Sequence, residues 1–486
     1  MSRRAPTRHA GHSRPCERAG RWAWRVLLPA LVLLPAAAHA SEAGAVALGA
    51  AWGLPFAGLL LSIAALPLLA PSLWHHHQGK ITLAWALAFL LPYAAQFGVP
   101  RALAGFMHAL LAEYLPFIVL ISTLYVVAGG IYLRGNLHGS PALNTALLGV
   151  GAVLASVMGT TGASMLMIRP VIRANDNRRH AAHVVVFFIF IVANAGGALT
   201  PLGDPPLFLG FLKGVDFFWT LRHLWPQTLF LVGVLLALFF AIDTFYFRRE
   251  PALARDPTPD THRLGFIGGV NFWLLGAVVG VVLLSGVWHP GVSLQVAGVD
   301  LALEGLVRDA GLLGVIALSL ALTPKEAHER NHFSWAPIRE VAVLFGGIFL
   351  TIIPVIALLR AGVNGPFGPV VAAVTGGDGR PDPFMYFWVT GALSSFLDNA
   401  PTYLVFFNTA GGDATQLMGA LAPTLAAIST GAVFMGANSY IGNAPNLMVK
   451  AIAEHRQIRM PGFFGYMVWS GCILIPLFVV MSLLWY

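Results

Sequence analysis

Hydrophobic and polar positions alternate along this chain in long blocks rather than within short segments. Apolar runs long enough to cross a bilayer lie at 46–71, 81–97, 113–133, 183–212, 224–247, 267–288, 305–323, 341–359, 418–452 and 463–486. Two further apolar stretches, 143–172 and 383–409, contain polar residues in their middle. The pattern predicts an all-α polytopic membrane protein with about ten transmembrane helices and two re-entrant hairpins.

Polar segments punctuated by glycine and proline occur twice. The two pairs of related segments are LASVMGTTGASML at 154–166 with LSSFLDNAPTYLV at 393–405, and GALTPLGDPPL at 197–207 with GANSYIGNAPN at 436–446. One offset of 239 residues relates both pairs, so that Leu154 falls on Leu393 and Gly203 falls on Gly442. Paired interruptions at corresponding places in two halves are typical of a transporter binding site. We therefore predict two repeats, each with a hairpin and a broken helix.

The repeats divide the chain into four parts. These are a leader at 1–40, a first repeat at 41–247 with hairpin 143–172 and broken helix 183–212, a polar cytoplasmic linker at 248–265, and a second repeat at 266–486 with hairpin 383–409 and broken helix 418–452. The leader has the arginine-rich start, short apolar core and Ala38-His39-Ala40 ending of a cleaved signal peptide. It predicts a bacterial inner-membrane protein whose mature N-terminus is periplasmic.

Composition supports this class, and charge adds the orientation of the helices. The chain is 57% hydrophobic and 10% charged, which excludes an ordinary soluble domain. Of its 29 Lys and Arg residues, only six fall in loops predicted to be periplasmic, namely Arg101, Lys213, Arg222, Arg308, Arg360 and Arg380. This is the positive-inside bias, so the net charge of +8 needs no nucleic-acid partner. The first hairpin then enters from the cytoplasm and the second from the periplasm, which makes the two halves inverted repeats.

Two acidic residues lie inside the interrupted segments. Asp204 falls in the break of the 183–212 span, and Asp398 falls at the tip of the second hairpin. A carboxylate at membrane depth is costly and usually faces a cavity with a function. The alternative is a partly buried acid that caps a half-helix or pairs with an arginine. Neutral oxygen and amide groups in the same segments complete the candidate site: Thr160, Thr161, Ser164, Asn194, Thr200, Asn399, Thr402, Asn438, Ser439, Asn443 and Asn446.

These motifs resemble those of the ion transporter superfamily, which includes NhaD-type sodium:proton antiporters, citrate and dicarboxylate transporters, and arsenite permeases. D-N-A-P in the second hairpin and the two broken segments P-L-G-D-P-P and G-A-N-S-Y-I-G-N-A-P-N are the matching motifs, and the layout matches over 46–486. The resemblance implies a scaffold domain, a mobile transport domain bearing the hairpins, and commonly a homodimer. Gly159-Thr160-Thr161 and Asp398-Asn399-Ala400 replace the Ser-Asn-Thr tips of dicarboxylate carriers, which favours an NhaD-type protein.

We therefore predict a secondary active transporter and not an enzyme. The favoured activity is Na⁺/H⁺ antiport by alternating access, because Na⁺ and H⁺ would compete for the charges of Asp204 and Asp398. Hard oxygen ligands suit Na⁺ better than a transition metal, and we expect no cofactor or resident metal. Uptake of citrate or another carboxylate coupled to Na⁺ or H⁺ is the alternative, although the four motifs contain no Lys or Arg. An intramembrane aspartyl protease is a remote alternative that leaves the repeat unexplained.

Histidines form two further groups. Three adjacent imidazoles at 75–77 fall between the first two predicted spans. They could bind a metal or sense pH, but a polar turn at the membrane interface is the simpler interpretation. His180 and His183 follow two arginines and are expected at the interface as well.

Overall fold

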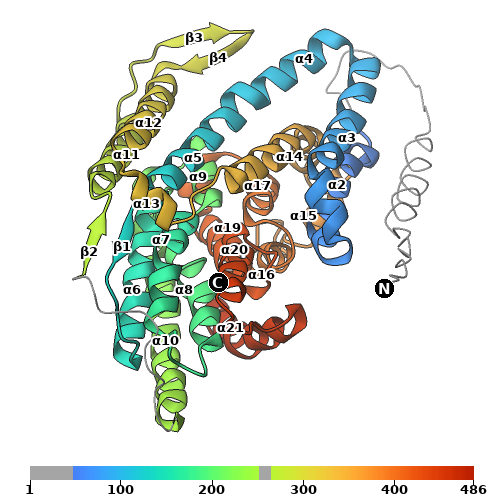
Figure 1. The fold of residues 1–486 in the computed structure, drawn as a ribbon. Coiled ribbons are helices and arrows are strands. Elements are labelled where there is room, and N and C mark those ends of the chain that lie inside the picture. Colours follow the sequence, from blue (N-terminus) through green and yellow to red (C-terminus); the bar gives the residue numbers. More distant parts are fainter. Residues whose placement is uncertain (1–47, 251–263) are drawn as a thin grey trace, which may run out of the picture.

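The computed structural model describes residues 48–250 and 264–486, and nearly all of them are helical (Figure 1). The predicted leader at 1–40 and most of the predicted linker lie outside these residues. The first half contains η1 (Ala50–Gly53), α2 (Leu54–Leu69), α3 (Pro71–Phe97), α4 (Val99–His108), the π-helical turn η2 (Ala109–Tyr114), α5 (Leu115–Gly129), β1 (Tyr132–Arg134), α6 (Pro141–Met158), α7 (Thr160–Ala174), α8 (Ala182–Ile191), η3 (Ala195–Leu199), α9 (Pro205–Leu212) and α10 (Phe217–Arg249).

The second half begins with a strand that pairs with β1 of the first half. It contains β2 (Gly265–Ile267), α11 (Val270–Val287), β3 (Ser293–Val296), β4 (Val299–Ala302), α12 (Leu303–Leu322), α13 (Lys325–Arg330), α14 (Ala336–Arg360), η4 (Gly362–Asn364), α15 (Gly368–Ala372), α16 (Pro383–Ser394), α17 (Asn399–Thr409), α18 (Ala414–Met418), α19 (Ala422–Met435), η5 (Gly436–Asn438), α20 (Ala444–His455) and α21 (Phe463–Trp485). Strands β1 and β2 are antiparallel, as are β3 and β4.

Ten helical segments within the described residues are long and apolar enough to cross a membrane. The predicted all-α polytopic class is therefore confirmed. The set differs from the predicted one at two places. It includes α6, the first arm of the first predicted hairpin, and it omits the 418–452 segment. The omission has a physical cause: a break separates α19, with 14 residues, from α20, with 12, and each is shorter than the bilayer requires.

The span predicted at 81–97 starts too late. Helix α3 begins at Pro71, one residue after the end of α2. The histidines at 75–77 therefore lie in the first two turns of α3 and not in a loop between two spans, and their position at the membrane interface stays a prediction. The apolar pattern could not show this start, because the first turns of α3 are polar. No metal-binding group of three His, Cys, Asp or Glu side chains occurs in the part of the chain that the structure describes.

Both predicted hairpins are pairs of helices that fold back on themselves. Helices α6 and α7 meet at Gly159, whose φ of 82° suits glycine. At the open end of this hairpin, Gly139 N donates to Ala174 O over 2.5 Å, so its first and last residues lie together. In the second hairpin, Tyr386 of α16 packs edge-on against Phe406 of α17, with ring centroids 6.1 Å apart.

The helices recur at the offset seen in the sequence. The 239-residue offset carries Thr160 onto Asn399 and Pro205 onto Ala444, and these four residues begin α7, α17, α9 and α20. Both predicted broken helices are interrupted, by η3 in the first half and by η5 in the second. Whether the two halves have opposite orientations in a membrane stays a prediction.

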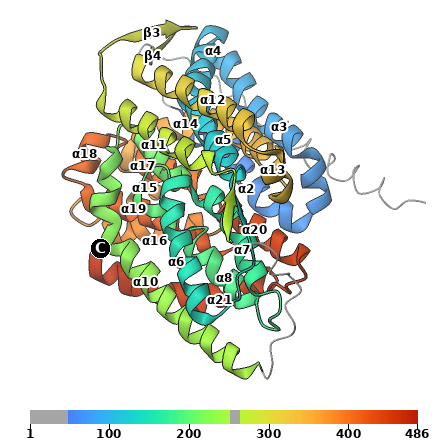
Figure 2. The same ribbon diagram turned by 60° about the vertical axis from the view of Figure 1, so that its left-hand side comes forward.

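Two groups of helices surround the hairpins in related ways. The pair α2–α3 packs against α14, and the pair α11–α12 packs against α5. In turn, α5 contacts α7 of the first hairpin, and α14 contacts α17 of the second. Figures 1 and 2 both show α12 and the β3–β4 ribbon at one edge and the end of α10 at the opposite edge. The hairpin tips therefore lie in the interior, next to α5 and α14.

A buried charged cluster holds the open end of the first hairpin. Asp243 of α10 lies 2.7 Å from Arg178 Nη1, 2.8 Å from His183 Nε2 and 2.9 Å from Asn144 Nδ2. The side chains of Arg178 and Asp243 are fully buried, and His183 is 3% exposed. The interfacial position of His183 stays a prediction, and the structure adds that its side chain is buried against Asp243. No pattern in the sequence indicates this partner, because Asp243 lies near the polar end of a span, where acids are ordinary.

The second half has no equivalents of these three ionisable residues. The offset places Ser482 at the position of Asp243, Leu417 at that of Arg178 and Ala422 at that of His183. Ser482 and Leu417 are buried. The fold of the repeat therefore does not require the ion pairs, in line with the general finding that apolar residues can replace a buried ion pair at little cost.

This comparison predicts the stability of two variants. Asp243→Asn leaves the Arg178 guanidinium buried without its carboxylate and should lower the free energy of unfolding by about 3–5 kcal/mol. The triple variant Arg178→Leu/His183→Ala/Asp243→Ser copies the second half and should recover most of that loss. Thermal unfolding of the purified protein in detergent measures both. A triple variant no more stable than Asp243→Asn would show that the first half needs these charges to fold.

Candidate functional site

Each hairpin tip lies against the broken helix of its own half through matching hydrogen bonds. Thr200 Oγ1 donates to Ser156 O over 2.5 Å. At the offset of 239 residues, Ser439 Oγ donates to Ser395 O over 2.5 Å. Ser156 Oγ in turn donates to Gly196 O of the break over 2.5 Å, whereas Ser395 Oγ shares its proton between Gly391 O of its own helix, at 2.7 Å, and Met435 O at the end of α19, at 3.2 Å. Thr200 and Ser439, predicted as binding residues, therefore bond to backbone here and fix the path of the breaks.

A glycine allows each break to fold onto itself. A Cβ added at Gly203 would lie 2.2 Å from Gly197 O, and one added at Gly442 would lie 2.6 Å from Gly436 O. Contacts this short are not observed for real side chains, so both positions require glycine. The offset of 239 residues aligns Gly197 with Gly436 and Gly203 with Gly442, and the close contact between the two glycines of each break explains why glycine occurs at both places.

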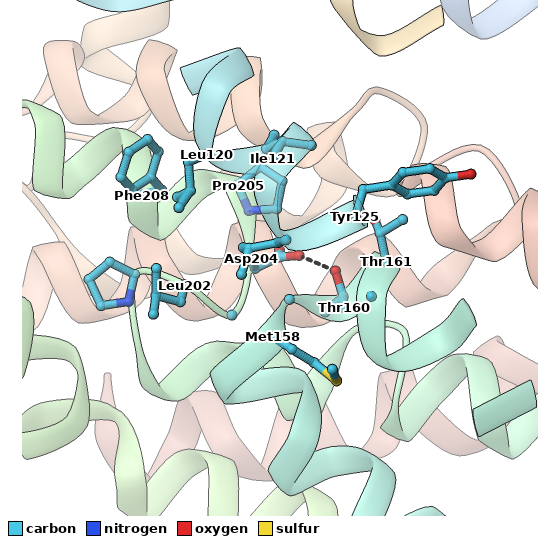
Figure 3. Close-up of a pocket in the computed structure, with 15 residues that line it drawn as sticks. Leu120, Ile121, Tyr125, Met158, Thr160, Thr161, Leu202, Asp204, Pro205 and Phe208 are labelled. Carbon is cyan, nitrogen blue, oxygen red and sulfur yellow. Dashed lines mark hydrogen bonds between the residues drawn. The ribbon is translucent and has the colours of Figure 1, made fainter. Parts of the chain in front are cut away.

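Both hairpin tips meet at Asp204. This residue precedes α9 and is 1% exposed. Its Oδ1 accepts a hydrogen bond from Thr160 Oγ1 over 2.9 Å, and its Oδ2 accepts one from Asn399 Nδ2 over 2.5 Å. Figure 3 shows the bond to Thr160. The two donors occupy equivalent positions of the repeat, as the first residues of α7 and α17. Within residues 48–250 and 264–486, no basic side chain pairs with this carboxylate.

The second predicted acid has a different environment. Asp398 is half-buried and precedes α17, where its Oδ1 accepts a hydrogen bond from Ala400 N over 3.3 Å. It is therefore a helix cap, which was the alternative considered for both acids. It also lies within electrostatic range of Asp204. The two aspartates thus share a region, but only Asp204 bonds to both tips.

Three asparagines join the breaks of the two halves. Asn194 Nδ2 donates to Asn446 Oδ1 over 2.8 Å, and Asn443 Nδ2 donates to Asn194 Oδ1 over 3.1 Å. Asn446 Nδ2 donates to the carbonyls of Gly436 and Ser439, both over 2.9 Å. All three side chains are buried. These predicted binding residues therefore bond to one another and hold the breaks together.

The remaining predicted site residues, which are Thr402, Asn438, Ser164 and Thr161, have different surroundings. Thr402 Oγ1 donates to a carbonyl of its own helical turn. Asn438 Nδ2 donates to Ser395 Oγ over 2.9 Å. Asn438 Oδ1 and Ser164 Oγ are buried and find no partner in the described part of the chain. Thr161 lines a cavity next to Asp204.

That cavity lies between α5 and the first hairpin tip (Figure 3). Its lining consists of Leu120, Ile121, Leu124 and Tyr125 from α5, Met158, Gly159, Thr160, Thr161 and Gly162 from the tip, and Pro201, Leu202, Gly203, Asp204, Pro205 and Phe208 from the break and α9. The site therefore lies between α5, which packs with α11 and α12, and the tip and break of the first half. The contribution of α5 could not be predicted from the sequence, since its apolar residues there are indistinguishable from lipid-facing ones.

Comparisons with known proteins agree with this architecture. A protein-family model described as putative citrate transport matches residues 45–486. Two proteins, each described as an uncharacterized transporter, come from Mycobacterium bovis and Mycobacterium tuberculosis; each is 28% identical over 330 residues, which is 65% of this chain and 70% of the relative. A protein of Mycobacterium leprae described as a 46 kDa membrane protein is 27% identical over 270 residues, 54% of this chain and 58% of that protein.

The glycines of the breaks provide a matched test of the site. Gly203→Ala and Gly442→Ala should each lower the free energy of unfolding by about 1–3 kcal/mol, because the added methyl overlaps a carbonyl. Gly233→Ala on α10 is the control, since nothing lies within 4 Å of its added Cβ. It should be neutral or stabilising by up to about 1 kcal/mol. Thermal unfolding in detergent measures all three, and a Gly203→Ala protein as stable as Gly233→Ala would contradict the geometry of the break.

Proposed function

The chain belongs to the putative citrate transport family, and we propose that it is a secondary transporter whose coupling cation binds at Asp204. The family and the relatives identify it as a membrane transporter. The observation that carries the proposal is a buried carboxylate that bonds to both hairpin tips and has no basic partner in the described residues.

The surroundings of Asp204 favour a proton or Na⁺ as its partner. A buried negative charge is very costly unless a proton or a cation neutralises it. Asn399 Oδ1 is also buried and has no hydrogen-bond partner within the described residues. Together with Thr160 Oγ1 and the carboxylate itself, it offers hard oxygen ligands, which alkali cations prefer to nitrogen or sulfur.

We favour Na⁺/H⁺ antiport as the activity. A single buried carboxylate can hold one proton or one Na⁺, so the two ions exclude each other from the site. Asp398 would add negative potential nearby and attract cations. The site lies between α5 and the first hairpin, so movement of the hairpins relative to α5 and α14 would expose it to each side of the membrane in turn.

The loop charges support an orientation for this cycle. We propose an inner-membrane protein with inverted halves, in which the open end of the first hairpin faces the cytoplasm and that of the second faces the periplasm. The Asp243 cluster would then lie on the cytoplasmic side. The positive-inside bias of the loops is the basis for this orientation.

Substitution of Asp204 and substitution of Asp398 should affect Na⁺/H⁺ exchange to different extents. Asp204→Asn removes the charge that a proton or Na⁺ would neutralise and should abolish Na⁺-driven proton movement in everted membrane vesicles. Asp398→Asn retains a good helix cap and should only reduce the apparent affinity for Na⁺ by a few fold. Asp382→Asn, a change at the cap of α16 outside the site, is the matched control. Normal exchange by the Asp204→Asn protein would refute the proposed cation site.

Cation-coupled transport of citrate or another carboxylate is the second candidate, and one arginine favours it. Arg169 of α7 is half-buried, and its Nη1 donates only to Met165 O of its own helix, over 3.4 Å. No carboxylate pairs with it in the described parts of the chain. It lies within electrostatic range of Arg456 and of Tyr125, which lines the cavity. A guanidinium without a carboxylate partner, close to a residue of the cavity wall, is suited to bind a carboxylate in a bidentate manner.

Arg169→Gln separates the two candidates. If the substrate is a carboxylate, losing a charged hydrogen bond worth about 1.5–3 kcal/mol should raise the KM for citrate uptake by roughly 10- to 150-fold. Arg459→Gln, at an exposed arginine, should leave uptake unchanged. If the protein is an antiporter without an organic substrate, vesicles should show no citrate uptake, and Arg169→Gln should leave Na⁺/H⁺ exchange intact.

A further inference from the structure

A second cavity lies between α3, the π-helical turn η2 and α14, apart from the residues around Asp204. Its volume is about 350 Å³, whereas one water molecule needs only about 10–15 Å³ by the same kind of measure. The walls are apolar except for Thr82 and Tyr114. An apolar space of this size does not hold ordered water well, so its natural occupant is hydrocarbon.

The cavity has access to the surface of the molecule. Gly79 and Leu83 of α3 line it, and both are exposed, Leu83 by 57%. Among the candidate spans of the described residues, α3 is the least buried, at 17%. The exposed face of a transmembrane helix contacts lipid, so acyl chains can reach this cavity from the bilayer.

Glycines on opposite walls leave the space open. In membrane proteins, glycine usually allows helices to approach closely. Here a Cβ added at Gly79 would meet only Val343, at 3.7 Å, and one added at Gly346 would meet only Tyr114, also at 3.7 Å. Larger side chains would therefore fit at both positions, and close packing of the protein does not explain these glycines.

One polar group in the wall lacks a partner. Thr82 is 4% exposed, and its Oγ1 forms no hydrogen bond within the described chain. A threonine in a helix ordinarily donates to the carbonyl four residues earlier, as Thr351 does in α14. In the observed rotamer this oxygen is enclosed, and rotation about χ1 would present the hydroxyl to a ligand in the cavity that offers an acceptor oxygen.

Charged side chains lie at one end of the same face of α3. His75 and His76 precede Gly79 by four and three residues, which places them on the face that lines the cavity. Both are exposed, as is Lys80. Glu340 of α14 lies within electrostatic range of His75. The order along α3 is thus basic side chains, then the Thr82 hydroxyl, then apolar wall.

We propose that this cavity binds a diacyl glycerophospholipid, with one acyl chain inside it. The phosphate would contact Lys80 and the imidazoles of His75 and His76, and an ester carbonyl would accept the hydrogen bond of Thr82. The basic side chains, the Thr82 hydroxyl and the apolar wall follow one another along α3 in the same order as the phosphate, the ester groups and the acyl chain follow one another along a phospholipid. A second copy of the chain could cover the apolar wall, but it would not explain the basic residues or the free hydroxyl.

Native mass spectrometry of the full-length protein, titrated with phosphatidylglycerol or phosphatidylethanolamine, tests this site. Wild-type protein should hold one phospholipid more tightly than the rest. Gly79→Leu and Gly346→Leu fill the cavity from opposite walls, and each should weaken that binding at least tenfold. Gly233→Leu, at an open position on α10, is the matched control and should bind as wild type does. Circular dichroism and thermal unfolding show which variants are folded.

The headgroup is tested separately. Lys80→Gln should weaken binding of both lipids if the phosphate is recognised, and a preference for phosphatidylethanolamine would assign its ammonium to Glu340. Two results would overturn the proposal. One is tight lipid binding that persists in folded Gly79→Leu and Gly346→Leu proteins. The other is the absence of tight lipid binding to the wild-type protein, together with a disulfide-linked dimer of a Leu83→Cys variant in which both native cysteines are replaced by serine.

Discussion

The structure depends on one constraint, which is that the polar groups of an interrupted helix inside a membrane must find partners within the protein. The two helix breaks meet this constraint with equivalent hydrogen bonds to the hairpin tip of the same half. A hydroxyl at Thr200 or Ser439 bonds to the backbone of the hairpin tip, and a serine of that tip bonds to the break. Because tip and break complete each other's hydrogen bonds, neither could be placed at this depth without the other.

The two repeats share one architecture, and the residues that differ between them include Asp204 and the Asp243 cluster. The position of Asp204 in the first half is occupied by Asn443 in the second, which bonds to Asn194 instead of to the hairpin tips. The Asp243 cluster likewise has no charged counterpart. The first half therefore carries Asp204 and the Asp243 cluster, whereas the second half has neutral side chains at those positions and carries Asp398 where the first half has Gly159. A transporter needs such an asymmetry if a single carboxylate is to bind the coupling cation.

The periphery adds a second kind of site. The cavity beside α3 is separated from the Asp204 site by α14, which contacts α3 on one side and the hairpin helix α17 on the other. A lipid bound there would contact α14 without touching the transported ion. In this arrangement the polar first turns of α3, which include the histidines at 75–77, would lie beside the phosphate of the bound lipid.

The sequence by itself determined the membrane class and predicted the repeat, the two hairpins, the two breaks and Asp204 as a candidate site residue, because each depends on residues close together in the chain or on one constant offset. It could not determine which polar groups are partners. Only the tertiary structure brought Asn399 of the second hairpin to Asp204 of the first half, and only it made Asp398 a helix cap and Asp243 the centre of a buried cluster. Contacts between residues far apart in the sequence follow from how the two halves pack, and hydrophobic periodicity does not encode that packing.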